Sequence, residues 1–342
     1  MTETELAKET MATLPNLLPE PGTLLEMYRR MLLIRKAEEQ LARDVKLGRT
    51  PGQVHCSDGQ EAVSVGLCAH LDDNDRITST HRGHGHFLAK GGDARVMFAE
   101  IYGKAEGICG GMGGSMHVAD FSKGIIGANG IVGAGLAIAT GAALASQLDR
   151  SDRVSVSFFG DGAANQGVLM ECLNIAALWK LPVLFVCENN GFSEFSPFEA
   201  VTAGVIADRA APFGMPNWRI DGNDVIEVWR TGAAAMDHVR SGCGPVFIEA
   251  HTYRYSGHFS AEAMILAKPY RSEDEIAEWR KRDPIMRFRT WLEDRTEVGT
   301  AELDRIAAKV DAEVSESVAF AESGTPPEPG TAAPLMFANG GA

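Results

Sequence analysis

Hydrophobic and polar positions in the central part of the chain follow the pattern of buried strands separated by helices. Residues 154–159 alternate and are rich in Val and Phe, which predicts a strand. Residues 166–180 carry hydrophobic side chains at helical spacing and are followed by Pro182, and residues 183–187 predict a second, buried strand. A strand–helix–strand unit of this length places its two strands parallel, with a right-handed crossover.

The alternation continues towards the C-terminus. Residues 218–220 predict a strand, a helix begins at about Asp224, and residues 246–250 predict another strand. We therefore expect an α/β protein whose open, mostly parallel sheet is flanked by helices.

Helical periodicity is also found before the sheet. Residues 23–46 predict a helix that ends near Gly48, and Asp58 and Asp93 are the predicted N-caps of two further helices. Between those two helices, residues 78–85 are polar and rich in His and Gly, which predicts a loop.

After the sheet, residues 253–268 lack periodicity and predict a loop. Ser272 and Glu275 form a capping box that opens an amphipathic helix, and residues 301–320 predict the last helix.

These elements predict one domain with two irregular ends. Residues 1–21 contain three prolines and little periodicity, so we expect a flexible N-terminal arm. Residues 22–322 are expected to form a single α/β domain with helical extensions, and residues 323–342 a C-terminal tail rich in Pro and Gly.

Composition narrows the class of protein. The 342 residues include 32 Lys and Arg against 46 Asp and Glu, a formal net charge of −14, and no basic block that would favour nucleic-acid binding. None of the six cysteines belongs to a C-x-x-C pair, which indicates reduced cysteines in a cytoplasmic protein rather than a disulfide framework or a zinc site. The acidic N-terminus is not typical of a secretory signal.

One uncharged segment raises the question of a membrane. No charged side chain lies between Lys123 and Asp149, which is long enough to span a bilayer. The segment is, however, rich in Gly and Ala and poor in large hydrophobic residues. We expect a helix buried on all sides, at a subunit interface, and no membrane association.

Polar residues follow both strands of the predicted β-α-β unit. Asp161 comes directly after the first strand and Asn190 after the second, so both are expected at the carboxyl edge of the sheet, where ligands bind. A carboxylate and an amide oxygen there suit Mg²⁺, and Gly160 and Gly162 allow the backbone to approach phosphates. Taken alone, Gly-Asp-Gly is equally typical of a simple turn.

The spacing strengthens the cofactor hypothesis. Gly160-Asp161-Gly162, 26 further residues and then Asn189-Asn190 resemble the fingerprint of thiamine-diphosphate enzymes. The runs at residues 160–167, 177–182 and 187–190 are similar to the α subunits of the pyruvate and acetoin dehydrogenase complexes. The resemblance extends from about Met27 to Phe288 and includes the blocks at residues 59–62, 113–117 and 129–133.

This resemblance implies the thiamine-diphosphate-binding fold and a set of roles. Asp161, Asn190 and the main-chain carbonyl of Phe192 would bind Mg²⁺, and Arg82 would hold the diphosphate. His55 and His258 would face the reacting carbon as the catalytic pair. The residues expected to contact the cofactor are His81, where many members have Tyr, Arg82, Gly130, Val132, Gly160, Asp161, Gly162, Ala163 and Asn190.

The resemblance also implies the reaction and the partners. Thiamine diphosphate would attack a carbonyl, and the two-carbon unit released would pass to a lipoyl group on an acyltransferase component. The glutamate that activates the cofactor would lie on a separate β subunit, so the active site would be shared in a heterotetramer of two α and two β chains.

Two segments of the sequence allow the candidate substrates to be ranked. Residues 120–129 and 191–197 are more similar to the acetoin type than to the pyruvate type, so we expect acetoin first and pyruvate second. Gly-Asp-Gly around Asp161 disfavours the branched-chain relatives, which tend to have Gly-Glu-Gly. Phe259 follows His258 where mitochondrial pyruvate enzymes have a regulatory serine.

Other interpretations remain open at this point. His81, His84 and His86 could form a metal site, although a positive side chain lies among them and no acidic or Cys partner is near in sequence. Arg254 and Arg271 could be solvated ion-pair partners. Two remote alternatives for the whole chain are a metal-dependent phosphohydrolase with Asp161 as nucleophile and a non-catalytic binding protein.

Overall fold

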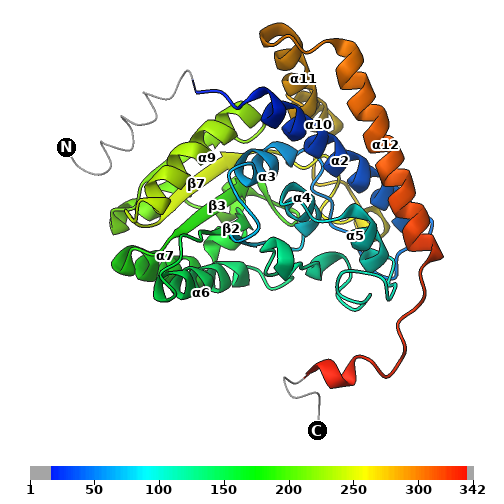
Figure 1. Cartoon of the computed structure of the whole chain (residues 1–342), viewed down its shortest axis with the longest axis horizontal. Coiled ribbons are helices and arrows are strands. Elements are labelled where there is room, and N and C mark those ends of the chain that lie inside the picture. Colours follow the sequence, from blue (N-terminus) through cyan, green and yellow to red (C-terminus); the bar gives the residue numbers. More distant parts are fainter. Residues whose placement is uncertain (1–16, 337–342) are drawn as a thin grey trace.

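The chain folds around a five-stranded sheet (Figure 1). The computed structural model describes residues 17–336, so most of the predicted N-terminal arm and the end of the predicted tail lie outside the described residues. All neighbouring strands of the sheet are parallel, in the order β1-β2-β3-β7-β6, which confirms the expected α/β class. The strands are β1 (Arg76–Thr78), β2 (Ser155–Gly160), β3 (Val183–Asn189), β6 (Asn217–Asp221) and β7 (Val246–His251).

Helices surround the sheet, and a short antiparallel hairpin, β4–β5, follows β3. The hairpin strands are Phe192–Ser193 and Ser196–Pro197. The helices are α2 (Pro21–Lys46), α3 (Glu61–Cys68), α4 (Gly83–Ala89), α5 (Ala94–Ile101), α6 (Ala134–Leu148), α7 (Gly167–Trp179), α8 (Phe198–Val201), α9 (Val225–Arg240), α10 (Glu273–Arg280), α11 (Pro284–Arg295) and α12 (Thr300–Ser323).

Alternate residues of the central strands face two hydrophobic cores. In β3, Leu184 and Val186 pack into a core that also contains residues of α2, α3 and α9, whereas Val183 and Phe185 pack into a second core with residues of α6 and α7. The continuous hydrophobic run at residues 183–187 is therefore explained by cover on both faces of the sheet, and each fully buried side chain of this size contributes about 1.5–3 kcal/mol.

The predicted β-α-β unit places the two polar turns side by side. Strands β2 and β3 are parallel neighbours, with Gly160 opposite Glu188. The residues that follow them, Asp161 and Asn190, therefore lie at the same edge of the sheet, as expected.

Two local predictions before the sheet are wrong. Helix α3 begins at Glu61 rather than at Asp58, whose carboxylate instead accepts hydrogen bonds from the backbone N–H of Ser256 at 3.1 Å and from its hydroxyl at 2.9 Å. Residues 78–85 are not a continuous loop, because β1 ends at Thr78 and α4 begins at Gly83.

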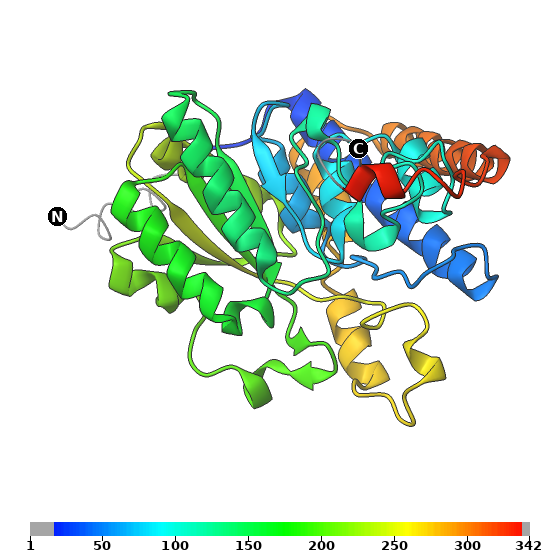
Figure 2. The ribbon, with the colours of Figure 1, turned by 90° about the horizontal axis from the view of Figure 1, so that it is seen from below.

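Beyond the sheet, the predicted capping box is confirmed. Ser272 Oγ accepts a hydrogen bond from the backbone N–H of Glu275 at 3.1 Å, and α10 begins at Glu273. The segment that leads into α10 projects from the body next to the β4–β5 hairpin, below the sheet in Figure 2. Both segments contribute residues to the cavity described below.

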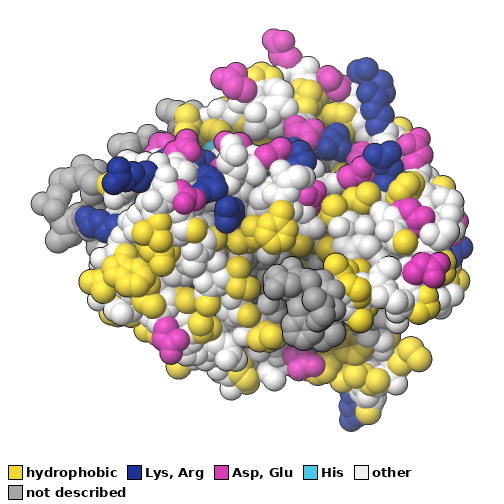
Figure 3. Space-filling model, turned by 60° about the horizontal axis from the view of Figure 1, so that its bottom comes forward, with side chains coloured by type: hydrophobic (Ala, Val, Ile, Leu, Met, Phe, Trp, Pro, Cys, Tyr) yellow, Lys and Arg dark blue, Asp and Glu magenta, His cyan; other side chains and the backbone are white. Residues whose placement is uncertain are grey.

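Helix α6 accounts for most of the long uncharged segment, but it is not buried on all sides. Leu136, Ala139 and Ala143 are buried, whereas Ile138 and Leu148 are 42% and 74% exposed. Hydrophobic side chains gather on the side of the molecule where α6 and α7 lie (Figure 3). Within residues 17–336, no helix is long and apolar enough to cross a membrane.

Candidate active site

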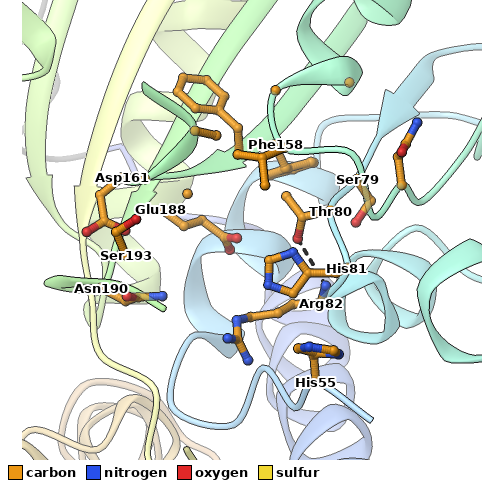
Figure 4. Close-up of a pocket in the computed structure, with 18 of the residues that line it drawn as sticks. His55, Ser79, Thr80, His81, Arg82, Phe158, Asp161, Glu188, Asn190 and Ser193 are labelled. Atoms are coloured by element: carbon orange, nitrogen blue, oxygen red, sulfur yellow. Dashed lines mark hydrogen bonds between the residues drawn. The ribbon is translucent and has the colours of Figure 1, made fainter. Parts of the chain in front are cut away.

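A cavity of about 310 Å³ opens at the carboxyl edge of the sheet (Figure 4). Its volume is at the lower end of the range of ligand pockets, about 300–1,000 Å³. The cavity brings together segments that are far apart in sequence: the loop before α3, the β1–α4 turn, the loop before α6, the ends of β2 and β3, the hairpin and the segment after β7. The predicted site residues among its lining are His55, His81, Arg82, Gly130, Val132, Gly160, Asp161, Gly162, Ala163, Asn190, Phe192 and His258.

Asp161 is a buried carboxylate with one free oxygen. The side chain is 2% exposed, and its Oδ2 atom has no hydrogen-bond partner among the described residues. Burial raises the pKa of Asp161 to about 6 because the ionised form is poorly solvated, even though Arg254 and Arg82 favour the charged form. A buried acceptor of this kind fits a bound cation.

The amide of Asn190 is oriented by its neighbours. Its Nδ2 atom donates to Oε1 of the buried Gln60 at 3.0 Å, and its Oδ1 atom accepts from the backbone N–H of Phe192 at 3.2 Å. An amide oxygen has two lone pairs, so Oδ1 retains one for a ligand. Together with Asp161 and the main-chain carbonyl of Phe192, it gives an all-oxygen donor set of the kind that Mg²⁺ prefers.

Two buried arginines lie beside the cavity without an acidic partner. Arg82 and Arg254 are 4% and 1% exposed, and neither forms an ion pair with any residue in the described part of the chain. Arg82 donates from Nη1 to the carbonyl of Cys56 at 2.9 Å, and burial together with the charge of Arg254 lowers its pKa to about 9. Unpaired buried guanidinium groups fit an anionic ligand, and the interpretation of Arg254 as a solvated ion-pair partner is wrong.

Arg271, the second arginine of that interpretation, is only partly buried. It donates to the main-chain carbonyls of Arg254 at 2.6 Å and Ser256 at 2.8 Å. These hydrogen bonds go to the main chain of the segment after β7 and not to an acidic side chain.

Three imidazole rings pack against one another in the cavity. The ring centroid of His55 lies 4.8 Å from that of His81 and 5.1 Å from that of His258, and the latter two are 5.4 Å apart. Burial and the charge of Arg82 lower the pKa of His55 to about 4 and the pKa values of His81 and His258 to about 2. All three rings are therefore neutral at physiological pH.

The other two histidines of the sequence cluster point elsewhere. The Nδ1 atom of His84 lies 3.0 Å from Oε2 of Glu38, and the Nδ1 atom of His86 lies 2.7 Å from Oγ of Ser79. No group of three His, Cys, Asp or Glu side chains within residues 17–336 is arranged to hold a metal ion. Of the three histidines, therefore, His81 lines the cavity, whereas His84 and His86 form hydrogen bonds in the structure behind it.

The glycine-containing turns border the cavity closely. A Cβ atom at Gly162 would lie 2.4 Å from Oγ of Ser193, so a larger residue here would displace that side chain of the hairpin. At Gly160 an added Cβ atom would meet nothing within 4 Å. Gly130 and Val132 form the rim of the cavity, where Val132 is 51% exposed.

Gln60 and Glu188 are two of the cavity residues to which the sequence analysis gave no role. Gln60 orients Asn190, and the buried carboxylate of Glu188 points into the cavity, 3.3 Å from Nε2 of His86 (Figure 4). A signal for Glu188 was present in the sequence, because an acidic residue at the end of a strand that is otherwise hydrophobic is expensive to bury and usually functional.

Comparison with known proteins places the chain in a family. Residues 29–330 match the family model described as the dehydrogenase E1 component. The chain is 47% identical to the α subunit of acetoin:2,6-dichlorophenolindophenol oxidoreductase from Bacillus subtilis over 306 residues, which cover 89% of this chain and 90% of that protein. The corresponding subunit from Cupriavidus necator is 43% identical, with coverages of 95% and 96%.

A relative named for a second substrate is nearly as similar. The α subunit of the pyruvate dehydrogenase E1 component from Rhizobium meliloti is 41% identical over 306 residues, which cover 89% of this chain and 87% of that protein. The family match implies thiamine diphosphate as the cofactor. The chain belongs to the dehydrogenase E1 component family.

Proposed function

We propose that this chain is the α subunit of a thiamine-diphosphate-dependent dehydrogenase that acts on acetoin. The observation that carries the proposal is the arrangement of charge in the cavity, where the free carboxylate oxygen of Asp161 accompanies Arg82 and Arg254, for which the described residues provide no acidic partner. A magnesium–diphosphate unit satisfies both kinds of group, because the metal takes oxygen ligands and the phosphates take guanidinium groups.

Different residues of the chain would bind the metal, the diphosphate and the aminopyrimidine. Asp161, Asn190 and the carbonyl of Phe192 would hold Mg²⁺, and Arg82 would hold the diphosphate beside the Gly160–Ala163 turn. Gly130 and Val132 would offer backbone groups to the aminopyrimidine at the rim of the cavity. When bound, thiamine diphosphate supplies a nucleophilic carbon that attacks the substrate carbonyl and accepts the electrons of the broken carbon–carbon bond.

The histidines complete the polar environment of the reaction. His55 and His258 lie in the same cavity as neutral rings, so each can donate or accept a hydrogen bond without bringing a net charge. We assign them to proton transfer and to stabilisation of the negative charge that develops on the substrate oxygen.

A partner chain is required by this proposal. The similar proteins are named as α subunits, which implies a β subunit. The β subunit would supply the glutamate that activates the cofactor, and two α and two β chains would form the complex. A lipoyl-bearing acyltransferase component would accept the two-carbon unit. The exposed hydrophobic face of α6 and α7 supports a contact with another chain.

The choice of acetoin rests on two segments that reach the cavity. Asn129 belongs to the first segment, residues 120–129, and Ser193 and Glu194 belong to the second, residues 191–197; all three side chains line the cavity. Both segments resemble the acetoin type, and the two relatives named for acetoin are 47% and 43% identical to the chain. Pyruvate is the second candidate, supported by the relative named for pyruvate at 41%.

The proposal can be tested with an artificial electron acceptor. The chain is co-expressed with its β subunit, and reduction of 2,6-dichlorophenolindophenol is followed with acetoin or pyruvate in the presence of thiamine diphosphate and Mg²⁺. We expect kcat/KM for acetoin to exceed that for pyruvate at least tenfold, about 1.4 kcal/mol of transition-state discrimination. A preference for pyruvate of the same size would contradict the substrate assignment and leave the cofactor assignment standing.

A further inference from the structure

The turn of the β4–β5 hairpin carries a carboxylate at the mouth of the cavity. Ser193 pairs with Ser196, so Glu194 and Phe195 are the two residues of the turn. Glu194 lines the cavity and is also exposed to solvent. It lies in residues 191–197, one of the two segments on which the choice of acetoin rests, so its side chain is a candidate for setting that choice.

The backbone of Glu194 has a conformation that favours glycine. Its φ angle is 55°, in the left-handed region. A two-residue hairpin turn with a positive φ at its first position usually has glycine there. A larger side chain in such a strained conformation persists only where its surroundings hold it, and strain of this kind gathers at functional sites.

Contacts on both residues hold the turn in place. The carbonyl of Glu194 accepts a hydrogen bond from Nη2 of Arg254. The ring centroid of Phe195 lies 5.2 Å from that of Tyr270 and 5.7 Å from that of His258. These contacts with the segment after β7 fix the place from which the Glu194 side chain reaches the cavity.

Glu194 is an acidic residue of the cavity whose charge has no counterpart. The acidic residues among the lining are Asp161, Glu188 and Glu194. Under the proposed function Asp161 holds the metal, and the carboxylate of Glu188 lies 3.3 Å from Nε2 of His86. The carboxylate of Glu194 forms no hydrogen bond and no ion pair with any residue between 17 and 336. Its charge therefore acts on whatever enters the cavity.

The positive side chains of the cavity lie deeper than this carboxylate. Arg82 and Arg254 are 4% and 1% exposed, whereas Glu194 is exposed. Under the proposed function, both guanidinium groups lie beside a diphosphate that offsets their charge. A substrate that enters after the cofactor therefore meets the negative charge of Glu194 first.

The two candidate substrates differ in the group that they would present to a carboxylate. Both have a ketone carbonyl that bears a methyl group. On its other side the carbonyl of acetoin has a carbon with a hydroxyl group, whereas that of pyruvate has a carboxylate. An ionised carboxylate only accepts hydrogen bonds, so it suits the hydroxyl of acetoin and repels the carboxylate of pyruvate. Placing like charges together is a means of rejecting the wrong ligand.

We propose that Glu194 is a specificity-determining residue that favours uncharged 2-hydroxyketones over 2-oxo acids through the negative charge of its side chain. The inference rests on the proposed function and deepens it, because it names the substrate class and the residue that selects it. Glu194 needs no part in binding the cofactor or in the bond chemistry for this role.

The first test removes the charge and keeps the size of the side chain. In the complex with the β subunit, Glu194→Gln should raise kcat/KM for pyruvate about tenfold, the scale of the repulsion between two charges a few ångströms apart near a surface. It should lower kcat/KM for acetoin, because an amide is a weaker acceptor than a carboxylate. Parallel changes for the two substrates, or no change, would overturn the inference.

A matched control is available in the same region of the chain. Glu199 is an exposed carboxylate in α8, directly after the hairpin, and does not line the cavity. Glu199→Gln removes one negative charge from the chain and should leave both values of kcat/KM unchanged. A gain for pyruvate in this variant equal to that of Glu194→Gln would mean that overall charge, and not Glu194, sets the preference.

Ionic strength gives a readout that a purely structural role would not move. Between about 0.01 and 0.15 M salt the Debye length falls from about 30 to about 8 Å. In the wild-type complex, kcat/KM for pyruvate should rise over this range because the repulsion is screened, and the rise should be smaller in Glu194→Gln. Identical salt dependence in the two complexes would contradict a role for the charge.

Glycine at this position separates the charge from the strained backbone. Glu194→Gly removes both, so it should unfold at a higher temperature than Glu194→Gln and show the same gain for pyruvate. A gain in the Gly variant that is absent from the Gln variant would assign the preference to the backbone of the turn and overturn the inference.

Measurements on the wild-type complex separate this inference from the function on which it rests. Thiamine diphosphate binding with Mg²⁺ is measured by calorimetry, and turnover is measured with both substrates. If the wild-type complex binds no cofactor, or does not prefer acetoin, the proposed function fails. If it binds the cofactor and prefers acetoin, and Glu194→Gln keeps that preference, only the role of Glu194 fails.

Discussion

At the scale of single residues, the candidate metal site depends on how one amide is oriented. Asn190 can present either its oxygen or its nitrogen to the cavity, and only the oxygen binds Mg²⁺. The hydrogen bond from Nδ2 to Gln60 Oε1, at 3.0 Å, holds the nitrogen away and leaves Oδ1 for the metal. Groups that orient a metal ligand in this way matter nearly as much as the ligand itself.

Replacing Gln60 should therefore weaken metal binding without removing a ligand. For Gln60→Met, which keeps the length and removes the acceptor, we expect the Mg²⁺ concentration needed for half-maximal thiamine diphosphate binding to rise about 10-fold or more. Calorimetric titration of the complex measures it. Gln53→Met, at an exposed position of the same loop, is the control and should leave the value unchanged. Equal Mg²⁺ dependence in the Gln60 variant and the wild type would show that the amide of Asn190 does not depend on Gln60 for its orientation.

The turn after β2 offers a second test at this scale. An added methyl group at Gly162 would meet Ser193 Oγ at 2.4 Å, whereas one at Gly160 would meet nothing within 4 Å. We expect Gly162→Ala to lower the free energy of unfolding by about 1–3 kcal/mol, the usual cost of overpacking, and Gly160→Ala to cost less. Thermal unfolding without cofactor measures both. A Ser193→Gly change in the Gly162→Ala background should recover part of the loss; no recovery would mean that the hairpin does not press on this turn.

At the scale of elements, one carboxylate holds the glycine-rich loop that follows α5, residues 109–114. The buried Glu100 in α5 accepts four backbone N–H groups at 2.7–3.0 Å, and a single side chain thus satisfies a loop that has no regular structure of its own. The donors are those of Cys109, Gly111, Gly113 and Gly114. The loop leads into Met116, which lines the cavity.

Weakening this carboxylate should loosen the loop. For Glu100→Gln, which keeps one acceptor oxygen of two, we expect amide hydrogen exchange in residues 109–114 to accelerate at least tenfold, about 1.4 kcal/mol of lost protection. Hydrogen-exchange mass spectrometry of the wild type and variant measures it. The matched control is Glu106→Gln, which changes the carboxylate that accepts from Thr325 instead. Unchanged exchange in residues 109–114 would contradict the role given to Glu100.

The elements that were predictable are those whose signal is local. Strand β2 follows from an alternating run rich in Val and Phe, β3 from a continuous hydrophobic run, and α10 from the Ser272–Glu275 capping box. Helix α4 was missed because its sequence of Gly and His has no hydrophobic periodicity, and it is held by tertiary contacts such as His84 to Glu38. Asp58 was assigned as a cap because its partner, Ser256, is 198 positions away in sequence.

The candidate site likewise has a part that the sequence predicts and a part that depends on tertiary structure. The Asp161 and Asn190 turns could be placed at one edge because parallel neighbouring strands require it. The burial of Arg254 and the packing of three imidazoles could not be predicted, because they depend on where the segment after β7 returns to the cavity. Residues at the ends of strands could therefore be placed from the geometry of the sheet, whereas those on long connections were identified only through the resemblance to a family.

At the scale of the whole molecule, the exposed face of α6 and α7 is the feature that a single chain does not explain. Ile138, Leu148, Leu178 and Trp179 are between 42% and 74% exposed. Large exposed hydrophobic patches mark sites of protein–protein contact. This is consistent with the expectation that the uncharged segment lies at a subunit interface.

A charge on this face should disrupt assembly. Ile138→Glu buries an unpaired carboxylate if another chain covers α6, a change that costs several kcal/mol. We expect the variant to fold, as judged by circular dichroism, but to fail to form the complex of the wild type in size-exclusion chromatography with light scattering. Met286→Glu, which also replaces an exposed hydrophobic residue, serves as the control. Assembly of the Ile138 variant to the wild-type mass would place the interface elsewhere.

The central claim is that the cavity binds thiamine diphosphate through a metal held by Asp161. It is tested most directly by calorimetric titration of thiamine diphosphate into the wild-type complex and into an Asp161→Ala complex, each with and without Mg²⁺. We predict binding to the wild type only when Mg²⁺ is present, and no measurable binding to the variant under either condition. Binding of thiamine diphosphate to the variant with equal affinity, or binding that does not depend on Mg²⁺, would contradict the claim that Asp161 holds the metal.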